Sequence, residues 1–193
     1  MFRIALDKTA ELRPLEPFEA PLFLALIERE RKHFAAWLPW AANIDTEEKA
    51  RAFIQRLADR QALDRGRGYA IWLDGVMVGG ALFRTFDVVS GNCEIGVCLA
   101  AHATGRGLMT KTCNKLIDWA FDERGMHRVE WHAASDNEPS IRTAKRLGMC
   151  RDGVMRQAFD YRNERHDVAV WSLLRTDARQ QQTFSNQPKD AAT

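Results

Sequence analysis

The feature that most constrains this chain is a Gly-Arg-Gly sequence between an apolar segment and an amphipathic one. The segment CEIGVCLA (93–100) has the composition of a buried strand. The segment LMTKTCNKLIDWAFDERG after the glycines has helical periodicity and ends at Gly125. Glycine permits close approach of a ligand, and a helix start exposes unpaired N–H groups at its positive end. The junction predicts a backbone site for phosphate or pyrophosphate, with a plain tight turn as the alternative.

Two familiar phosphate loops are excluded at this junction. No Gly-Lys-Ser/Thr follows the glycines, so the segment is not a Walker loop. The GxGxxG fingerprint of dinucleotide-binding folds is absent as well. The glycine junction alone therefore does not identify the anion that it would bind, and the rest of the sequence is needed for that.

Length and composition favour one ordinary globular domain. We expect a single domain over residues 1–175 and a polar C-terminal tail over 176–193. A formal net charge of +2 argues against a dedicated nucleic-acid binder, and no run of about 18 apolar residues predicts a membrane span. The cysteines form no CxxC pair and no metal-ligand cluster, which favours reduced thiols in a cytoplasmic protein without a metal: Cys93, Cys98, Cys113 and Cys150.

Hydrophobic periodicity predicts alternating strands and helices along the chain. Asp45 and Glu48 have capping-pair spacing, and Asp74-Gly75 is typical of a hairpin turn. The order predicts an α/β (α+β) fold with a mixed, mostly antiparallel twisted sheet of about seven strands and helices on both faces. Helices are expected at 17–33, 45–63, 107–124 and 138–148, and strands at 2–6, 11–15, 70–73, 76–83, 93–100, 127–134, 149–161 and 166–174.

The stretch from Glu94 to Met149 resembles the core of the GNAT family of N-acetyltransferases, which bind acetyl-CoA. The family's Gln/Arg-x-x-Gly-x-Gly/Ala signature corresponds here to His102-Ala-Thr-Gly105-Arg-Gly107, with a departure at His102. A finer resemblance is to the branch that acetylates ribosomal-protein N-termini, and it covers about residues 2–175. That resemblance rests on EIGVCL, GRGLMTK, AASDNEPSIRTAKRLGM, WLPW and RDGVMRQAF…HDVAVWSLL.

The resemblance implies a GNAT fold and transfer of acetyl from acetyl-CoA to a primary amine, most often a protein N-terminal α-amine. The strand before the loop would hold the pantetheine through its backbone, with one N–H polarising the thioester carbonyl. Asn137 would contact the cofactor and is equally suited to cap the helix that follows it. The implied cofactor-binding residues are Val97, Cys98, Leu99, Gly105, Arg106, Gly107, Leu108, Met109, Thr110 and Asn137.

Catalytic and acceptor-binding roles are less defined by the sequence. Ser140 would donate a proton to the departing thiolate, although a serine in a first helical turn is often only local. Glu94 is the first candidate for the general base, with a paired strand-end carboxylate or a water relay as alternatives. Phe34, Trp37 and Trp40 would form an acceptor-site wall or simply pack in the core. The histidines His127, His132 and His166 lack metal spacing and are interpreted as structural or surface residues.

Several alternatives stay open. The acceptor could be a small amine such as an amino-acid conjugate, a polyamine or an antibiotic. The chain could also be a non-catalytic acyl-CoA-binding module, and a nucleic-acid role ranks third because its arginines alternate with acids. We expect a cytoplasmic homodimer with no nucleic-acid or membrane partner, the dimer by resemblance to the branch.

Overall fold

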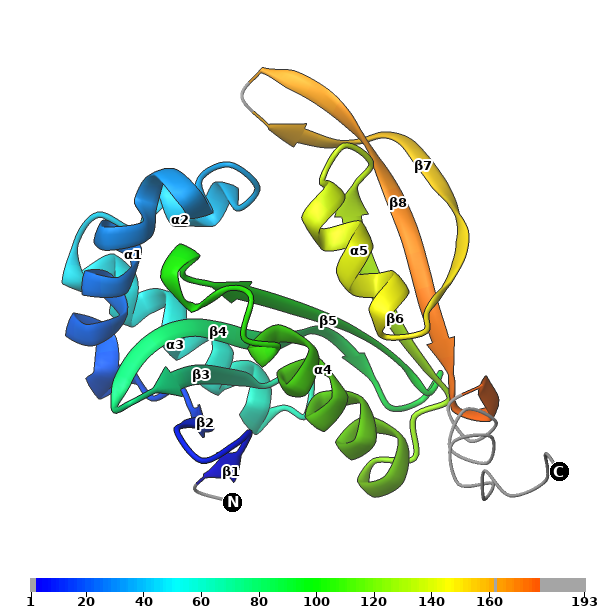
Figure 1. Cartoon of the computed structure of the whole chain (residues 1–193), viewed down its shortest axis with the longest axis horizontal. Coiled ribbons are helices and arrows are strands. Elements are labelled where there is room, and N and C mark those ends of the chain that lie inside the picture. The colour runs from blue at the N-terminus through cyan, green and yellow to red at the C-terminus, as the bar shows by residue number, and fades with distance from the viewer. Residues whose placement is uncertain (1–2, 162, 178–193) are drawn as a thin grey trace, which may run out of the picture.

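One twisted sheet organises the computed structural model, which describes residues 3–161 and 163–177 (Figure 1). The sheet has eight strands in the order β1-β2-β3-β4-β5-β6-β8-β7, which confirms the expected mixed, mostly antiparallel sheet of about seven strands. Each neighbouring pair is antiparallel except β5 and β6. The strands are β1 (Ile4–Ala5), β2 (Ala10–Pro14), β3 (Gly68–Leu73), β4 (Val76–Asp87), β5 (Asn92–Leu99), β6 (Arg128–Ala134), β7 (Cys150–Tyr161) and β8 (Glu164–Leu174).

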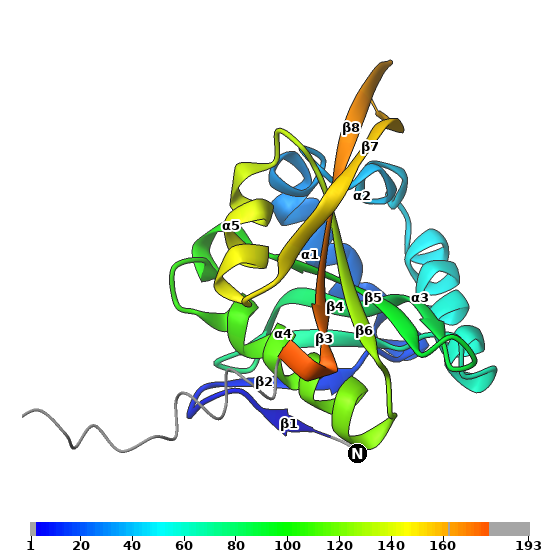
Figure 2. The ribbon, with the colours of Figure 1, turned by 90° about the vertical axis from the view of Figure 1, so that its right-hand side faces the viewer.

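Helices cover both faces of this sheet, as expected (Figure 2). Side chains of α1 and α3 build one hydrophobic cluster, and α4 builds a second with β4, β5 and β6. No helix in the described ranges has both the length and the apolar run needed to cross a membrane. The helices are α1 (Ala20–Phe34), α2 (Pro39–Asn43), α3 (Glu47–Ala62), α4 (Leu108–Asp118) and α5 (Glu138–Arg146), with short 3₁₀ turns at Pro17–Glu19 and Ala101–Ala103 and a π-helical turn at Trp119–Glu123.

Local sequence signals explain most element ends. Asp74 and Gly75 both have positive φ, as the predicted hairpin turn between β3 and β4 requires. The expected cap at Asp45 is wrong, because Thr46 is the N-cap of α3 and its side chain accepts from the Lys49 amide. Asp45 instead forms an ion pair with the Lys49 Nζ at 2.6 Å. The tail predicted beyond residue 175 lies outside the described residues from 178 onward.

The parallel contact between β5 and β6 is short, and this positions the site. Only Asn92, Cys93 and Glu94 pair with β6, opposite Arg128, Val129 and Glu130. Beyond Glu94 the two strands separate, while β5 stays paired to β4 as far as Leu99 and β6 stays paired to β8 as far as Ala134. The sheet therefore opens at its centre, with unpaired backbone on the facing edges of β5 and β6.

Candidate active site

A cavity of about 1170 Å³ occupies the opening between β5 and β6. Its volume exceeds the roughly 300–1,000 Å³ of an ordinary small-molecule site, so it has room for two ligands. The cavity reaches from the glycine loop before α4, through the strand gap, to the residues after α1. It is lined by every site residue predicted from the sequence except Arg106: Glu94, Val97, Cys98, Leu99, Gly105, Gly107, Leu108, Met109, Thr110, Asn137, Ser140, Phe34, Trp37 and Trp40.

The glycine loop presents bare backbone to one end of the cavity. Gly105 and Gly107 have φ of +78° and +73°, a region that favours glycine. A Cβ at either glycine would meet no atom of the described residues within 4 Å. Gly107 is the N-cap of α4, and the first amide to close the helix is that of Lys111. The amides of Leu108, Met109 and Thr110 therefore point out of the helix end, as an anion site requires.

The free edge of β5 offers a second set of backbone donors. Ala100 donates its N–H to the Val78 carbonyl on β4. Because N–H groups alternate in direction along a strand, the Cys98 amide also faces β4, whereas the Val97 and Leu99 amides face the gap. The Leu99 carbonyl fits this direction, since it lies 3.2 Å from the His33 Nε2 of α1. Of the three predicted strand residues, Val97 and Leu99 supply backbone donors and Cys98 supplies a side chain.

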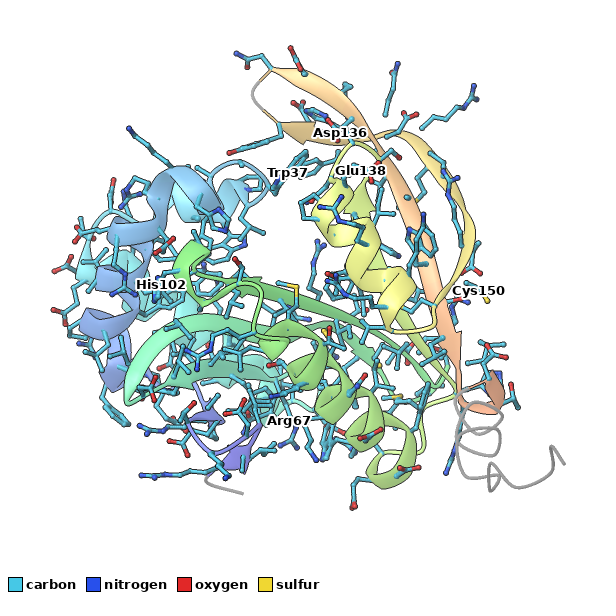
Figure 3. All side chains as sticks on the ribbon, in the orientation of Figure 1. Trp37, Arg67, His102, Asp136, Glu138 and Cys150 are labelled. Carbon is cyan, nitrogen blue, oxygen red and sulfur yellow. The ribbon has the colours of Figure 1, made fainter. Side chains whose placement is uncertain are left out.

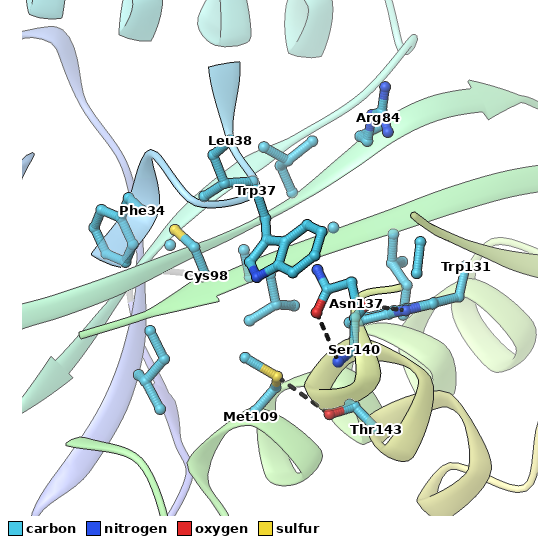
Figure 4. Close-up of a pocket in the computed structure, with 18 of the residues that line it drawn as sticks. Phe34, Trp37, Leu38, Arg84, Cys98, Met109, Trp131, Asn137, Ser140 and Thr143 are labelled. Carbon is cyan, nitrogen blue, oxygen red and sulfur yellow. Dashed lines mark hydrogen bonds between the residues drawn. The ribbon is translucent and has the colours of Figure 1, made fainter. Parts of the chain in front are cut away.

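The start of α5 lies across the gap from the glycine loop (Figure 4). The Asn137 side chain accepts from the Ser140 amide at 3.2 Å, which confirms the predicted cap. The Ser140 Oγ accepts from the Trp131 indole Nε1 at 2.9 Å. A hydroxyl that accepts from Trp131 keeps its own hydrogen available to donate into the cavity.

The polar group at the other end of the cavity centres on Glu94. Glu94 is 6% exposed, and its Oε1 accepts from the Arg84 Nη1 at 2.9 Å. The His132 Nδ1 lies 3.7 Å from the same oxygen, and the His132 Nε2 lies 3.0 Å from the Glu130 Oε2. The imidazole therefore lies between a buried carboxylate and a second, more exposed one. A water bridging the 3.7 Å separation from Glu94 would complete a path for a proton out of the cavity.

The three predicted wall aromatics divide between wall and core. Trp40 stacks on Phe23 and Phe53 with ring centroids 6.1 and 5.0 Å apart, and Phe34 is 3% exposed. Both line the cavity, yet both belong to the packing of α1 on the sheet. Trp37 is half-buried on the loop after α1 and lies over the cavity beside Asn137 (Figure 4).

Two residues of the family signature contribute little side chain to the cavity. His102 lies beside α1 (Figure 3), where its Nδ1 is 3.4 Å from the buried Glu30 Oε1. Glu30 also accepts from the Ala101 amide at 3.0 Å, so this carboxylate fixes the loop against α1. The Arg106 side chain is exposed and outside the cavity lining, which leaves only its amide within the glycine loop.

The Cys98 thiol faces the cavity but is not a nucleophile at neutral pH. Burial raises its pKa to about 11, so the thiolate is scarce there. Among the described residues, no three His, Cys, Asp or Glu side chains are grouped so that they could hold a metal ion. The polar groups of the cavity are therefore arranged for hydrogen bonding and proton transfer.

Sequence reasoning missed several residues of the cavity. His132 was interpreted as structural, although strand alternation places it with Glu130 on the face of β6 that Glu94 shares. No local sequence pattern predicted Arg84 as a site residue, because it contacts Glu94 from the neighbouring strand β4. Further lining residues with no sequence signal are His33, Arg60, Thr143, Arg146 and Phe159.

Comparisons with known proteins agree with this geometry. Residues 10–150 match the family described as the acetyltransferase (GNAT) domain. A protein of Bacillus subtilis (strain 168) named ribosomal N-acetyltransferase YdaF is 30% identical over 182 residues, which span 92% of this chain and 97% of that protein.

Solved structures show the same fold. RimL, a ribosomal L7/L12 alpha-N-protein acetyltransferase in complex with coenzyme A, superposes with a TM-score of 0.85 at 22% identity over 89% of this chain and 97% of that one. The microcin C7 self-immunity acetyltransferase MccE, in complex with acetyl-CoA and AMP, gives a TM-score of 0.83 at 23% identity over 89% and 95%.

Proposed function

This chain belongs to the GNAT acetyltransferase family, and on that premise we propose that it acetylates the α-amine at the N-terminus of a protein or peptide. It is an N-acetyltransferase that uses acetyl-CoA as donor. The observation that carries the choice of acceptor is the cavity beyond the strand gap. Trp37, Leu38 and Phe159 line the cavity of about 1170 Å³, and these apolar side chains suit the first residues of a peptide. The similarity to YdaF along nearly its whole length supports the same acceptor class.

The residues present fit coenzyme A. The cradle over Gly105 and Gly107 is open where a Cβ would fill it, and the amides around it lack partners among the described residues. We propose that the amides from Gly105 to Thr110 hold the pyrophosphate, and that the free β5 edge holds the pantetheine through Val97 and Leu99. Asn137, on the opposite wall, would contact the same arm. When bound, acetyl-CoA supplies the activated thioester carbonyl.

The Val97 amide is the strongest candidate to polarise that carbonyl. It faces the gap at the level where the cavity is lined from both β5 and β6. A fixed backbone N–H stabilises developing negative charge on oxygen without reorganisation. The Cys98 amide cannot take this role, because it points to β4.

Proton transfer is proposed for Glu94 and Ser140. The attacking amine must be neutral, and the new carbon–nitrogen bond releases one proton as the carbon–sulfur bond breaks. Glu94 would accept the amine proton through water and pass it along His132 toward Glu130. Ser140 Oγ would give a proton to the departing sulfur, oriented by its hydrogen bond from Trp131.

The test is thiol release from acetyl-CoA with two acceptor panels at matched concentration. One panel holds peptides with free N-termini, and the other holds polyamines, aminoglycosides and amino-acid conjugates. Peptide turnover with mass-verified α-amine acetylation supports the proposal. Turnover confined to the small amines would replace the acceptor class. Acetyl-CoA binding without turnover of any amine would favour the non-catalytic module.

We also propose that residues 1–175 form one domain, that the protein works in the cytoplasm, and that it forms a homodimer. All three proposals rest on analogy with the ribosomal-protein acetyltransferase branch. The exposed Val154 and Met155 on the edge strand β7 supply apolar surface suited to a second copy. Light scattering coupled to size-exclusion chromatography measures the oligomeric state.

A further inference from the structure

The charge around the cavity is unbalanced, and its cationic side chains have no role in the proposed mechanism. Four cationic side chains line the cavity, Lys32, Arg60, Arg84 and Arg146, against the single carboxylate of Glu94. Arg146 lies on α5, the helix that packs beside α4, and donates to Thr143 at 3.0 Å. Arg84 lies at the opposite end of the cavity from the glycine loop, on the acceptor side.

Arg84, which lines the cavity, lies at a β-bulge of β4. The β4–β5 register runs from Phe83 opposite Ile95 to Thr85 opposite Glu94, so Arg84 is the extra residue between them. The strand bends at such a position. Arg84 stays beside Glu94 all the same, because its Nη1 donates to the Glu94 Oε1 at 2.9 Å.

Contacts with α3 and β5 hold Arg84 in this position. The Arg60 guanidinium of α3 donates to the Arg84 carbonyl and so ties down the bulge. The stem of Arg84 passes over Gly96 of β5, where a Cβ would lie 3.4 Å from the Arg84 Cδ. Arginine side chains ordinarily lose much rotamer freedom on binding. The contact with Glu94 already orders the side chain and reduces that cost for any ligand that Arg84 meets.

Arg84 lies too far from the glycine loop to hold the donor's pyrophosphate. Glu94, its partner, and Leu99 are five residues apart on β5, which is about 17 Å of extended strand, and the loop begins beyond Leu99. In Figure 4 Arg84 lies away from Met109 and Thr143. Its partner in the cavity is Glu94, which belongs to the proposed acceptor side.

The chemistry of a guanidinium limits what Arg84 can bind. It has five N–H donors and no acceptor, and the contact with Glu94 Oε1 is made by Nη1. Its side chain is 59% exposed, against 8% for that of Glu94, so the remaining donors are open to the cavity. A carboxylate matches such a fork in shape and charge. The nearby acids at the start of α5 do not line the cavity, and they pair elsewhere: Asp136 with His166, and Glu138 with Arg142.

We propose that Arg84 binds a carboxylate of the acceptor, so that the preferred substrate is an amine with an acidic group close to it. In the peptide setting of the proposed function, on which this inference rests, that substrate is an N-terminus with Asp or Glu within its first residues. The same placement disfavours polyamines and aminoglycosides, because Arg60, Arg84 and Lys32 would repel a polycation.

The experiment uses three free-amine peptides that differ only at the second residue, Asp, Asn or Lys, and a matching set varied at the third. We measure kcat and KM by thiol release for the wild type, Arg84→Gln, Arg84→Lys and the exposed control Arg51→Gln. The kcat/KM ratio of the Asp to the Asn peptide should be about 10 or more in at least one set, through KM. It should fall to about 1 in Arg84→Gln, stay partial in Arg84→Lys and remain at the wild-type value in Arg51→Gln.

Other results separate this inference from a structural role and from the proposed function. If Arg84 only positions Glu94, Arg84→Gln lowers kcat for the Asp and Asn peptides equally and the ratio survives, which overturns the proposal. A wild-type ratio of 1 in both sets overturns it too, whatever the variants do. If no peptide is acetylated, the proposed function fails, and calorimetric binding of the peptides to the coenzyme A complex decides the inference. Asp-peptide binding that is tighter and lost in Arg84→Gln supports it, and equal binding overturns it.

Discussion

The two ends of the cavity differ in the chemical groups that they present, which are backbone N–H groups at one end and side chains at the other. At the proposed donor end, the contacts would come from main-chain N–H groups of one segment, Val97 to Thr110, where two glycines leave open space. At the proposed acceptor end, the contacts would come from side chains on separate elements: Arg84 on β4, Glu94 on β5, His132 on β6 and Trp37 after α1. The donor end should tolerate changes in most side chains but not in backbone shape. The acceptor end should respond to single side-chain changes while coenzyme A binding persists.

The most disruptive change to the donor end is Gly105→Glu. It places an L-residue at φ +78° and a carboxylate where the pyrophosphate would lie. We expect at least about a 100-fold loss of coenzyme A affinity by calorimetry, with the fold retained. Gly125→Glu is the matched control, because Gly125 has φ +66° and open space around its Cβ but lies at the far end of the α4 segment. Equal loss in both variants would mean that backbone strain, and not the loop, is responsible.

At the acceptor end, Glu94→Gln should lower kcat by about 100-fold, since an amide cannot accept the amine proton. Coenzyme A affinity should change little, because the contacts of Glu94 are with Arg84 and His132. The pH dependence of kcat/KM should lose the limb that Glu94 contributes. Glu47→Gln, which removes an exposed carboxylate paired to Arg51, serves as control. An unaltered pH profile would assign the base to another group.

Ser140→Ala tests the point where the two ends meet. We expect about a 10-fold fall in kcat, larger than any rise in the KM for acetyl-CoA, because the departing sulfur loses its proton donor. The Trp131 Nε1 also loses its acceptor, so intrinsic fluorescence and thermal unfolding report any structural cost. An unchanged kcat in single-turnover measurements would remove Ser140 from the proton path.

The smallest expected effect is on thermal stability, from an ion pair that holds α4 at the donor end of the cavity. Lys111 on α4 pairs with Asp7 at 2.7 Å, and this hydrogen bond lowers the pKa of Asp7 from its ordinary value of 3.8 to about 2. A depressed folded-state pKa means that the stabilisation is present above about pH 4 and is lost as pH falls toward 2. Because the pair is exposed, Asp7→Asn should lower Tm at pH 7 by no more than about 4 °C. The difference from the wild type should disappear near pH 2, and a difference that persists there would point to the turn at Thr9 and not to the ion pair.

Much of the fold and of the donor end could be predicted from the sequence. The Asp74-Gly75 turn, the Asn137 cap and the strand–glycine–helix junction each depend on interactions within a few residues. The resemblance to the GNAT family identified acetyl-CoA as the cofactor. Where the prediction was wrong, a neighbouring residue competed for the same local role, as Thr46 did for Asp45.

The acceptor end shows what a sequence does not specify locally. Arg84 and Glu94 meet because β4 and β5 are neighbouring strands of the sheet. His132 approaches Glu94 because β6 pairs with β5 at Glu94 and Glu130, two residues before His132.

The elements, their order and the proposed backbone site for an anion could be inferred from the sequence, since φ preferences, caps and periodicity act over short distances along the chain. The side chains that surround the proposed acceptor site, Arg84 among them, became visible in the folded structure. Strand register and the opening between β5 and β6 depend on contacts between residues far apart in sequence, and no local pattern encodes them.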